Sequence, residues 1–211
     1  MDNLLEAYIR DHIDAEPENL RHLDRLTNIR LINGRMCSGH IQGRLLKMLV
    51  EMIKPRHALE LGTFSGYSAL CIAEGMDEDA RLDTFEIDDE LEDFIREAFA
   101  ASPHGKKITL HIGDAAKEIG QWPRESLDLI FIDADKREYR EYYRITFPLL
   151  RSGGFIIADN TLWDGHVTEP EEKHSAHTRE IIAFNEMVKN DPRVEKVILP
   201  LRDGLTIIRK I

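Results

Sequence analysis

The sequence predicts a three-layer α/β fold of the Rossmann-like kind, with helices on both faces of one sheet. Between residues 57 and 190, short apolar runs alternate with amphipathic segments of helical period, which is typical of parallel strands joined by crossover helices. The last two apolar runs, 194–199 and 205–209, are separated by a tight turn and predict a hairpin. The sheet should therefore be mostly parallel, with an antiparallel strand at its end.

The individual elements follow from the same pattern. The first 50 residues are expected to be helical because apolar side chains such as Leu20, Leu23 and Leu26 recur every three or four positions, and Pro55 ends that region. The strands expected before the hairpin are residues 57–61, 81–87, 108–112, 127–132 and 154–158. Helices are expected from residue 67, over 91–101, near residue 116, and over 138–150 and 177–190.

Length and composition limit the class of protein. A chain of 211 residues has the size of one α/β domain, so residues 1–211 are predicted to form a single domain. Neither a membrane span nor a signal peptide is readable, so we expect a cytoplasmic protein that does not enter a membrane. A net charge of −11 disfavours broad binding to nucleic acid phosphates. Cys37 and Cys71 lack a metal or disulfide-framework spacing and are expected to be free thiols.

A glycine-rich turn follows the first predicted strand. Gly62 and Gly66 have the spacing G-x-x-x-G, without the third glycine of the dinucleotide pattern, and Glu60 lies at the end of the strand. A carboxylate there is a poor neighbour for a pyrophosphate. It suits S-adenosylmethionine, which carries an ammonium and a sulfonium and no phosphate. The alternative is a glycine turn needed only for packing.

Two more acids follow predicted strands. Glu86 closes the second strand, where an acid can accept hydrogen bonds from both hydroxyls of a ribose; the alternative is an acid that is exposed at a strand end. Asp114, after Gly113, could lie beside an adenine amino group, but a turn or a helix cap is an equally good interpretation.

An acidic cluster is expected at the ends of the next two strands. Asp133 and Lys136 follow residues 127–132, and Asp159 and Asn160 follow residues 154–158. The two carboxylates and the carboxamide are oxygen donors that favour Mg²⁺ over zinc or copper. The alternative is a set of helix caps, with Asp135 or Asp159 beginning a helix and Lys136 a solvated charge.

This cluster suits the activation of a hydroxyl group. A phenolic hydroxyl has a pKa of about 10, so its attack on a methyl sulfonium near neutral pH requires loss of the proton or polarisation of the oxygen. A metal can polarise the oxygen, and Lys136 can accept the proton if the metal and partial burial lower its pKa.

The polar connection after Asn160 contains aromatic and histidine residues. Trp163 could stack on an aromatic substrate or could anchor the loop by its burial. His166, His174 and His177 fit no zinc pattern and are expected to be solvent-exposed.

With these residues assembled, the chain resembles the cation-dependent O-methyltransferases, the family of catechol and caffeoyl-coenzyme A O-methyltransferases. The most specific motifs are LELGTFSGYS at 59–68, FIDADK at 131–136, ADNTLWDG at 158–165 and GLTII at 204–208. The resemblance implies a seven-stranded sheet with the last strand antiparallel, extra N-terminal helices and a homodimer. It also implies that residues 1–50 form a lid and substrate region.

The resemblance further implies roles for individual residues. Lys136 matches the proton-accepting lysine, and Asp133 is the second catalytic candidate. Asp133, Asp159 and Asn160 match the ligands of Mg²⁺ or a similar ion, such as Mn²⁺ or Ca²⁺. Lys136 and Trp163 are the candidates for substrate contact. The cofactor-binding candidates are Met36, Glu60, Gly62, Thr63, Phe64, Ser68, Glu86, Ile87, Gly113, Asp114, Ala115 and Asp133.

The methyl acceptor expected from this resemblance is a small hydroxylated aromatic molecule. The acidic segment Glu169-Pro-Glu-Glu-Lys argues against a coenzyme A thioester. A hydroxylated uridine of transfer RNA is the alternative, left open by a group of basic N-terminal residues: Arg21, Arg25, Arg30, Arg35 and Arg44. The rival classes are an NAD-dependent oxidoreductase, which Glu60 disfavours, and a non-catalytic nucleotide-binding module, which would not need the acidic cluster.

Overall fold

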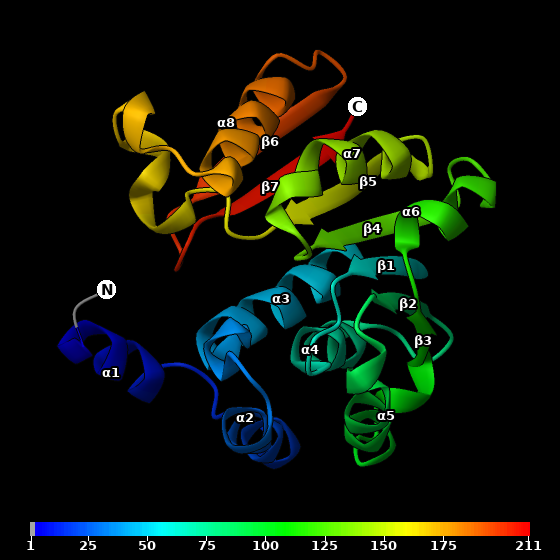
Figure 1. The fold of residues 1–211 in the computed structure, drawn as a ribbon. Coiled ribbons are helices and arrows are strands. Elements are labelled where there is room, and N and C mark those ends of the chain that lie inside the picture. The colour runs from blue at the N-terminus through cyan, green and yellow to red at the C-terminus, as the bar shows by residue number, and fades with distance from the viewer. Residues whose placement is uncertain (1–2) are drawn as a thin grey trace.

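The structure is a computed structural model that describes residues 3–211. Within these residues, seven strands form one sheet in the order β3-β2-β1-β4-β5-β7-β6 (Figure 1). Its strands are β1 His57–Leu61, β2 Arg81–Glu86, β3 Ile108–Ile112, β4 Leu127–Ile132, β5 Leu150–Ala158, β6 Val194–Leu199 and β7 Leu205–Lys210. Strands β1 to β5 pair in parallel, and β7 is antiparallel to both β5 and β6. This confirms the predicted sheet with its antiparallel last strand.

Helices cover both faces of the sheet, which confirms the three-layer α/β fold (Figure 1). None of the helices within residues 3–211 is long and apolar enough to cross a membrane. The helices are α1 Asn3–Asp11, α2 Glu18–Arg30, α3 Gly39–Ile53, α4 Tyr67–Gly75, α5 Glu92–Ala100, α6 Ala115–Glu118, α7 Tyr139–Thr146 and α8 Ala176–Lys189.

The side chains of the central strand β4 point alternately to the two faces of the sheet, and each face is covered by its own layer of helices. Leu129 and Phe131 belong to the core that is shared with α3, α4 and α5. Ile130 and Ile132 belong to the opposite core, with residues of α7 and α8. Successive side chains of a strand point to opposite faces, so a strand buried on both faces reads as a continuous apolar run.

The carboxyl ends of β1, β4 and β5 lie next to one another. The amide of Asp133 donates to the carbonyl of Leu61 at 2.9 Å, and the amide of Asp159 donates to the carbonyl of Ile132 at 2.9 Å. Pairing thus continues one residue beyond each strand. The strand order reverses between β1 and β4, and ligands of such open sheets bind at the carboxyl ends of strands beside this point.

One predicted boundary is wrong. A helix was expected over residues 138–150 and a strand over 154–158, but α7 ends at Thr146 and β5 begins at Leu150. Leu150 pairs with Leu127, and the register then shifts before Leu129. Gly153, with φ +77°, permits this irregularity. The sequence pattern cannot show that the helix has ended before residue 150, because an apolar residue such as Leu150 fits a buried helix and a buried strand equally well.

Helix α3 packs closely on α4 because Gly43 has no side chain. A Cβ at Gly43 would lie 2.8 Å from Cys71 Sγ and 3.0 Å from Tyr67 Cε1. We therefore expect Gly43→Ala to lower the free energy of unfolding by about 1–3 kcal/mol, although alanine is the better helix former. Urea unfolding followed by circular dichroism measures this change. Gly120→Ala is the control, since a Cβ there meets nothing within 4 Å. Equal stability of both variants would contradict the prediction.

Candidate active site

The glycine turn after β1 is held against β2 and β4. The amides of Gly62 and Thr63 both donate to the carbonyl of Phe85, at 3.0 and 3.1 Å. Gly62 has φ +93°, and a Cβ there would lie 2.2 Å from the carbonyl oxygen of Asp133. Only glycine fits this position. The turn therefore brings bare backbone to the edge of the sheet where Asp133 lies.

Glu60 is a fully buried acid beneath this turn. Its Oε2 accepts a hydrogen bond from Thr84 Oγ1 at 2.5 Å, and Thr84 Oγ1 also lies 2.7 Å from Thr63 Oγ1. Within residues 3–211, Glu60 Oε1 has no hydrogen-bond partner. Burial raises the pKa of Glu60 to about 8. A buried carboxylate oxygen without a partner is costly, and a cationic ligand with N–H donors would relieve that cost.

Glu86 fixes the turn to the end of β2. Its Oε2 accepts a hydrogen bond from the amide of Phe64 at 2.7 Å, and its Oε1 accepts one from the amide of Asp88 at 3.0 Å. Its side chain is buried, whereas that of the following Ile87 is 75% exposed. Each carboxylate oxygen can accept a further bond. The ribose contact of Glu86 stays a prediction, and the structure adds a second role in shaping the turn.

Asp114 caps a helix. Its Oδ1 accepts a hydrogen bond from the amide of Ala116 at 3.0 Å, at the start of α6. This confirms the helix-cap interpretation of Asp114. The amide of the preceding Gly113 donates to the carbonyl of Glu86 at 2.8 Å, so Gly113, Asp114 and Ala115 follow directly beside Glu86. An adenine contact of Asp114 stays a prediction.

The structure brings Lys136 onto Asp133. Lys136 Nζ lies 2.7 Å from Asp133 Oδ1, and only 13% of its side chain is exposed. The alternative interpretation of Lys136 as a solvated charge is therefore wrong. Asp135 does begin a short 3-10 helix, since it accepts a hydrogen bond from the amide of Arg137 at 3.0 Å. The capping interpretation thus holds for Asp135.

Asp159 is the buried acid of the cluster. Its Oδ1 accepts a hydrogen bond from the amide of Asn160 at 2.7 Å, and its Oδ2 accepts one from Gln42 Nε2 at 2.5 Å. Burial, and after it the charge of Asp133, raises the pKa of the Asp159 carboxyl. Asn160 has φ +56° and donates from Nδ2 to Asp203 Oδ2 at 3.3 Å. This bond therefore uses the Nδ2 group of Asn160 and not its carboxamide oxygen.

The ion pair with Asp133 also determines the pKa of Lys136. Burial lowers its pKa, but the charge of Asp133 and the contact with Tyr139 outweigh burial, so the pKa of Lys136 lies above its usual value. From the sequence, a lowered pKa was expected on condition that a metal lies nearby and the side chain is partly buried, and this condition stays a prediction. The physical reason for the raised pKa is the ion pair with Asp133, which stabilises the ammonium form.

The donors at this edge fit a divalent cation. Two carboxylates and a carboxamide oxygen are hard ligands. The carboxylates of Asp159 and Asp133 repel each other, and Lys136 supplies only one positive charge against their two negative charges. A bound cation would relieve this repulsion. Among the described residues, no group of three or more His, Cys, Asp or Glu is placed to hold a metal. Asn160 and solvent or substrate oxygens would therefore complete the ligand set.

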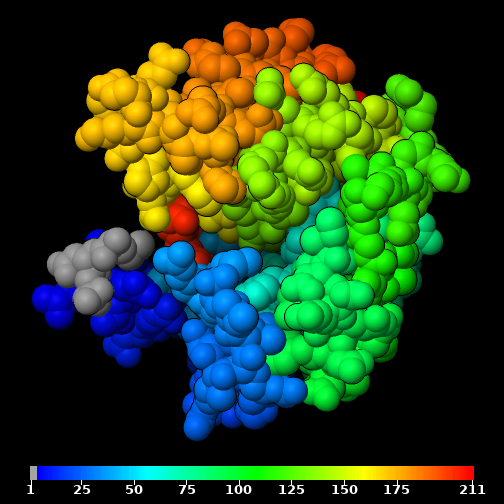
Figure 2. Space-filling model, viewed as in Figure 1, coloured from blue at the N-terminus to red at the C-terminus, as the bar shows by residue number. Residues whose placement is uncertain are grey.

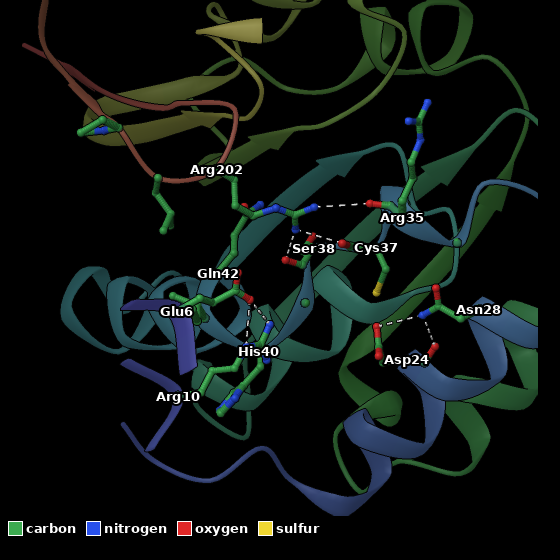
Figure 3. A pocket seen from close by; sticks show the side chains of 15 residues that line it. Glu6, Arg10, Asp24, Asn28, Arg35, Cys37, Ser38, His40, Gln42 and Arg202 are labelled. Carbon is green, nitrogen blue, oxygen red and sulfur yellow. Dashed lines mark hydrogen bonds and ion pairs between the residues drawn. The ribbon is translucent and has the colours of Figure 1, made fainter. Parts of the chain in front are cut away.

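The N-terminal segment lies beside the cluster. Met36, the expected cofactor contact, is 55% exposed, and Cys37 and Ser38 after it are buried. Arg202, from the turn between β6 and β7, donates to the carbonyl of Cys37 at 2.9 Å and to that of Ser38 (Figure 3). Cys37, Ser38 and Arg202, but not Met36, line a cavity of about 510 Å³ whose wall also includes Gln42. The surface is hollowed between the blue N-terminal segment and the yellow-green half of the molecule (Figure 2).

The sequence singled out neither Gln42 nor Arg202. Both lie in unremarkable positions of the pattern, Gln42 in an amphipathic helix and Arg202 in a turn. Their contacts join residues more than 100 positions apart in the chain. Both cysteines are free thiols, as expected.

The loop after Asn160 folds back onto the protein. Trp163 is half-buried and stacks on His177 with ring centroids 5.8 Å apart, so it anchors the loop. His174 is also half-buried, and its Nε2 lies 2.8 Å from the carbonyl of Glu169. Only His166 is exposed. The expectation of exposed histidines is correct for His166 and wrong for His174 and His177, because the loop packs against the start of α8.

Comparison with known proteins agrees with the fold and the motifs. The model of the O-methyltransferase family matches residues 10–211. A probable caffeoyl-CoA O-methyltransferase of Dictyostelium discoideum is 30% identical over 99% of this chain and 92% of its own length. The crystal structure of a Podospora anserina methyltransferase bound to SAH has a TM-score of 0.90 at 28% identity, covering 99% of this chain and 94% of that one.

A second solved structure gives the same result. The O-methyltransferase TomG from Streptomyces achromogenes, which is involved in tomaymycin synthesis and was solved in complex with SAM, has a TM-score of 0.89 at 25% identity. The alignment covers 99% of this chain and 96% of TomG. The chain therefore belongs to the O-methyltransferase family, which confirms the resemblance carried by its motifs.

Proposed function

We propose that this protein transfers the methyl group of S-adenosylmethionine to a hydroxyl of a small, catechol-like aromatic molecule, assisted by a divalent cation and by Lys136. One observation carries the proposal, the alignment of the ends of β1, β4 and β5. It places Glu60, Asp133 and Asp159 along one edge of the sheet. A cationic methyl donor and a hydroxyl that is activated by a cation would meet there, and this proximity supplies much of the rate of an in-line transfer.

The cofactor would lie along the glycine turn. Glu60 Oε1, which lacks a partner in residues 3–211, would accept a hydrogen bond from the ammonium group of the methionine part. Glu86 would bind the ribose, and Asp114 would face the adenine. The relatives that were solved with SAH and with SAM support this assignment. The remaining candidates would line the same site: Met36, Gly62, Thr63, Phe64, Ser68, Ile87, Gly113, Ala115 and Asp133.

Asp133, Asp159 and Asn160 would hold Mg²⁺ or another hard divalent cation such as Mn²⁺ or Ca²⁺. When bound, the cation would supply Lewis-acid polarisation of the acceptor hydroxyl, whose pKa in a free phenol is about 10. Gln42 and the amide of Asn160 orient the Asp159 carboxylate by one hydrogen bond to each of its oxygens.

Lys136 would accept the hydroxyl proton at Nζ. Only the neutral amine can do this, and the free carboxylate of Asp133, 2.7 Å away, stabilises the ammonium form. Once Asp133 serves as a cation ligand, its charge is shared and stabilises that ammonium less. Lys136 would thus be able to act as a base only when the cation is bound.

The acceptor would bind between the lid formed by residues 1–50 and the loop that carries Trp163. Because one face of Trp163 packs on His177, the indole has a fixed orientation in which its remaining surface can contact an aromatic ring. The relatives named for caffeoyl-CoA support an aromatic acceptor with neighbouring hydroxyls. A homodimer stays a prediction.

The contacts of the N-terminal arginines disfavour transfer RNA as the acceptor. Arg21 pairs with Glu18 at 2.7 Å, Arg30 with Glu97 at 3.4 Å and Arg44 with Glu74 at 2.6 Å. Three of the five positive charges therefore face acids of the protein itself. Phosphate binding would have to break or share these pairs.

A substrate panel tests the proposal. Labelled S-adenosylmethionine and Mg²⁺ are incubated with catechol, caffeic acid, caffeoyl-CoA and bulk transfer RNA, with and without EDTA. We expect label on the small catechols, its loss with EDTA and its return with excess Mn²⁺. Label on transfer RNA alone would favour the alternative acceptor. Methylation that EDTA leaves unchanged would contradict the cation, and thermal stabilisation by NAD but not by S-adenosylhomocysteine would contradict the cofactor.

A further inference from the structure

Gln42 joins the N-terminal helices to the acidic cluster. It lies on α3, is 1% exposed, and donates from Nε2 to Asp159 Oδ2 at 2.5 Å. It also forms part of the wall of the cavity beneath Arg202 (Figure 3). It is thus the side chain through which α3 contacts a proposed cation ligand directly.

The backbone at Gln42 has a fixed position. The next residue, Gly43, allows α3 to contact Tyr67 and Cys71 of α4 without space for a single added carbon. Helix α4 in turn begins at Tyr67, directly after Gly66 of the glycine turn. Gln42 is therefore attached to a rigid pair of helices, whereas a surface glutamine would lose its orientation to side-chain entropy.

Within the described part of the chain, the Gln42 amide is oriented so that Nε2 makes a hydrogen bond and Oε1 does not. Its Oε1 is buried and has no partner within residues 3–211, although a buried amide oxygen without a partner costs about 1–3 kcal/mol. The bond from Nε2 to a carboxylate offsets this cost because bonds to ionised groups are stronger. Packing alone would favour an apolar residue here. The donor must therefore serve Asp159.

We propose that Gln42 is a positioning residue that fixes the Asp159 carboxylate for cation binding. This inference rests on the proposed function. Asp159 Oδ1 is held by the amide of Asn160 and Oδ2 by Gln42 Nε2, so the plane of the carboxylate is set from both sides. Partners of this kind orient metal ligands, and their loss weakens metal binding about 10–100-fold.

The test measures cation affinity in Gln42→Met. Methionine keeps the length of the side chain and removes the unpaired oxygen, so the variant should fold. We expect the Kd for Mn²⁺, measured from the electron paramagnetic resonance of free Mn²⁺, to rise at least about tenfold. The Kd for S-adenosylhomocysteine in EDTA, measured by calorimetry, should stay within about twofold. Gln121→Met is the matched control, because Gln121 is exposed.

The outcomes separate this inference from the proposed function. Wild-type protein that binds Mn²⁺ and a variant that binds it equally well would overturn the role of Gln42 and leave the cation site standing. Parallel loss of Mn²⁺ and S-adenosylhomocysteine binding would show a merely structural role, and it too would overturn the inference. Wild-type protein without Mn²⁺ affinity would remove the cation site and the inference together. If the methionine variant does not fold, Gln42→Ala is measured in the same way.

Discussion

Replacing Lys136 by methionine should lower kcat for methyl transfer about 10²–10⁴-fold, the usual contribution of a positioned proton acceptor. Lys136 Nζ lies 2.7 Å from Asp133, at the edge where donor and acceptor are expected to meet, and methionine has no group that can take a proton. The Kd for S-adenosylhomocysteine should change little, because Lys136 contacts none of the residues of the glycine turn through a hydrogen bond that we observe. Steady-state kinetics and calorimetry measure the two quantities.

Lys136→Arg separates charge from proton transfer. Arginine restores the positive charge beside Asp133 but does not lose its proton in proteins, so it should not restore kcat. Lys189→Met is the matched control, since Lys189 and Glu186 form an exposed pair with the same spacing of three residues. Full activity of either Lys136 variant would contradict the role as a base.

The second large effect is expected for Glu60→Gln, which should stabilise the ligand-free protein at pH 9 and weaken cofactor binding. The pKa of Glu60 is about 8 in the folded protein, above its ordinary value of 4.5. Between these two values the unfolded chain has released a proton that the folded protein retains. Stability therefore falls as pH rises from about 4.5 to 8, by an amount on the order of 5 kcal/mol. Glutamine removes this decline.

Urea unfolding at pH 5 and pH 9 measures this effect. Near pH 5 the variant and the wild type should differ little, and at pH 9 the variant should be the more stable. Its Kd for S-adenosylhomocysteine should rise at least about tenfold, because the amide cannot supply a charge to the ammonium group. Glu172→Gln, at an exposed position, is the control. A stability difference that does not depend on pH would argue against the buried carboxyl as its source.

The residues that the sequence could locate are those whose place follows from a strand end. Asp133 and Asp159 each follow a buried apolar run directly, so the edge at which they meet could be predicted from periodicity alone. The same holds for Glu60 beside the glycines. These are local signals, and parallel pairing brings them together without further information.

The contacts that the sequence could not locate depend on tertiary packing. Gln42 is one polar residue in an amphipathic helix, and no local pattern shows that its amide reaches Asp159. His177 was expected to be exposed, since periodicity does not report that a polar loop folds back and stacks Trp163 on the following helix. The raised pKa of Lys136 similarly depends on a side-chain geometry that spacing does not determine.

The contact of Arg202 with Cys37 and Ser38 has a consequence for the order of folding. Arg202 lies in the turn between β6 and β7, and β7 must insert between β5 and β6. The first helices are synthesised early, but the side chain that holds their connection to α3 is synthesised more than 160 residues later. The connection before α3 therefore reaches its final place only after the hairpin of β6 and β7 has formed. Loss of that hairpin would be felt at the N-terminal helices.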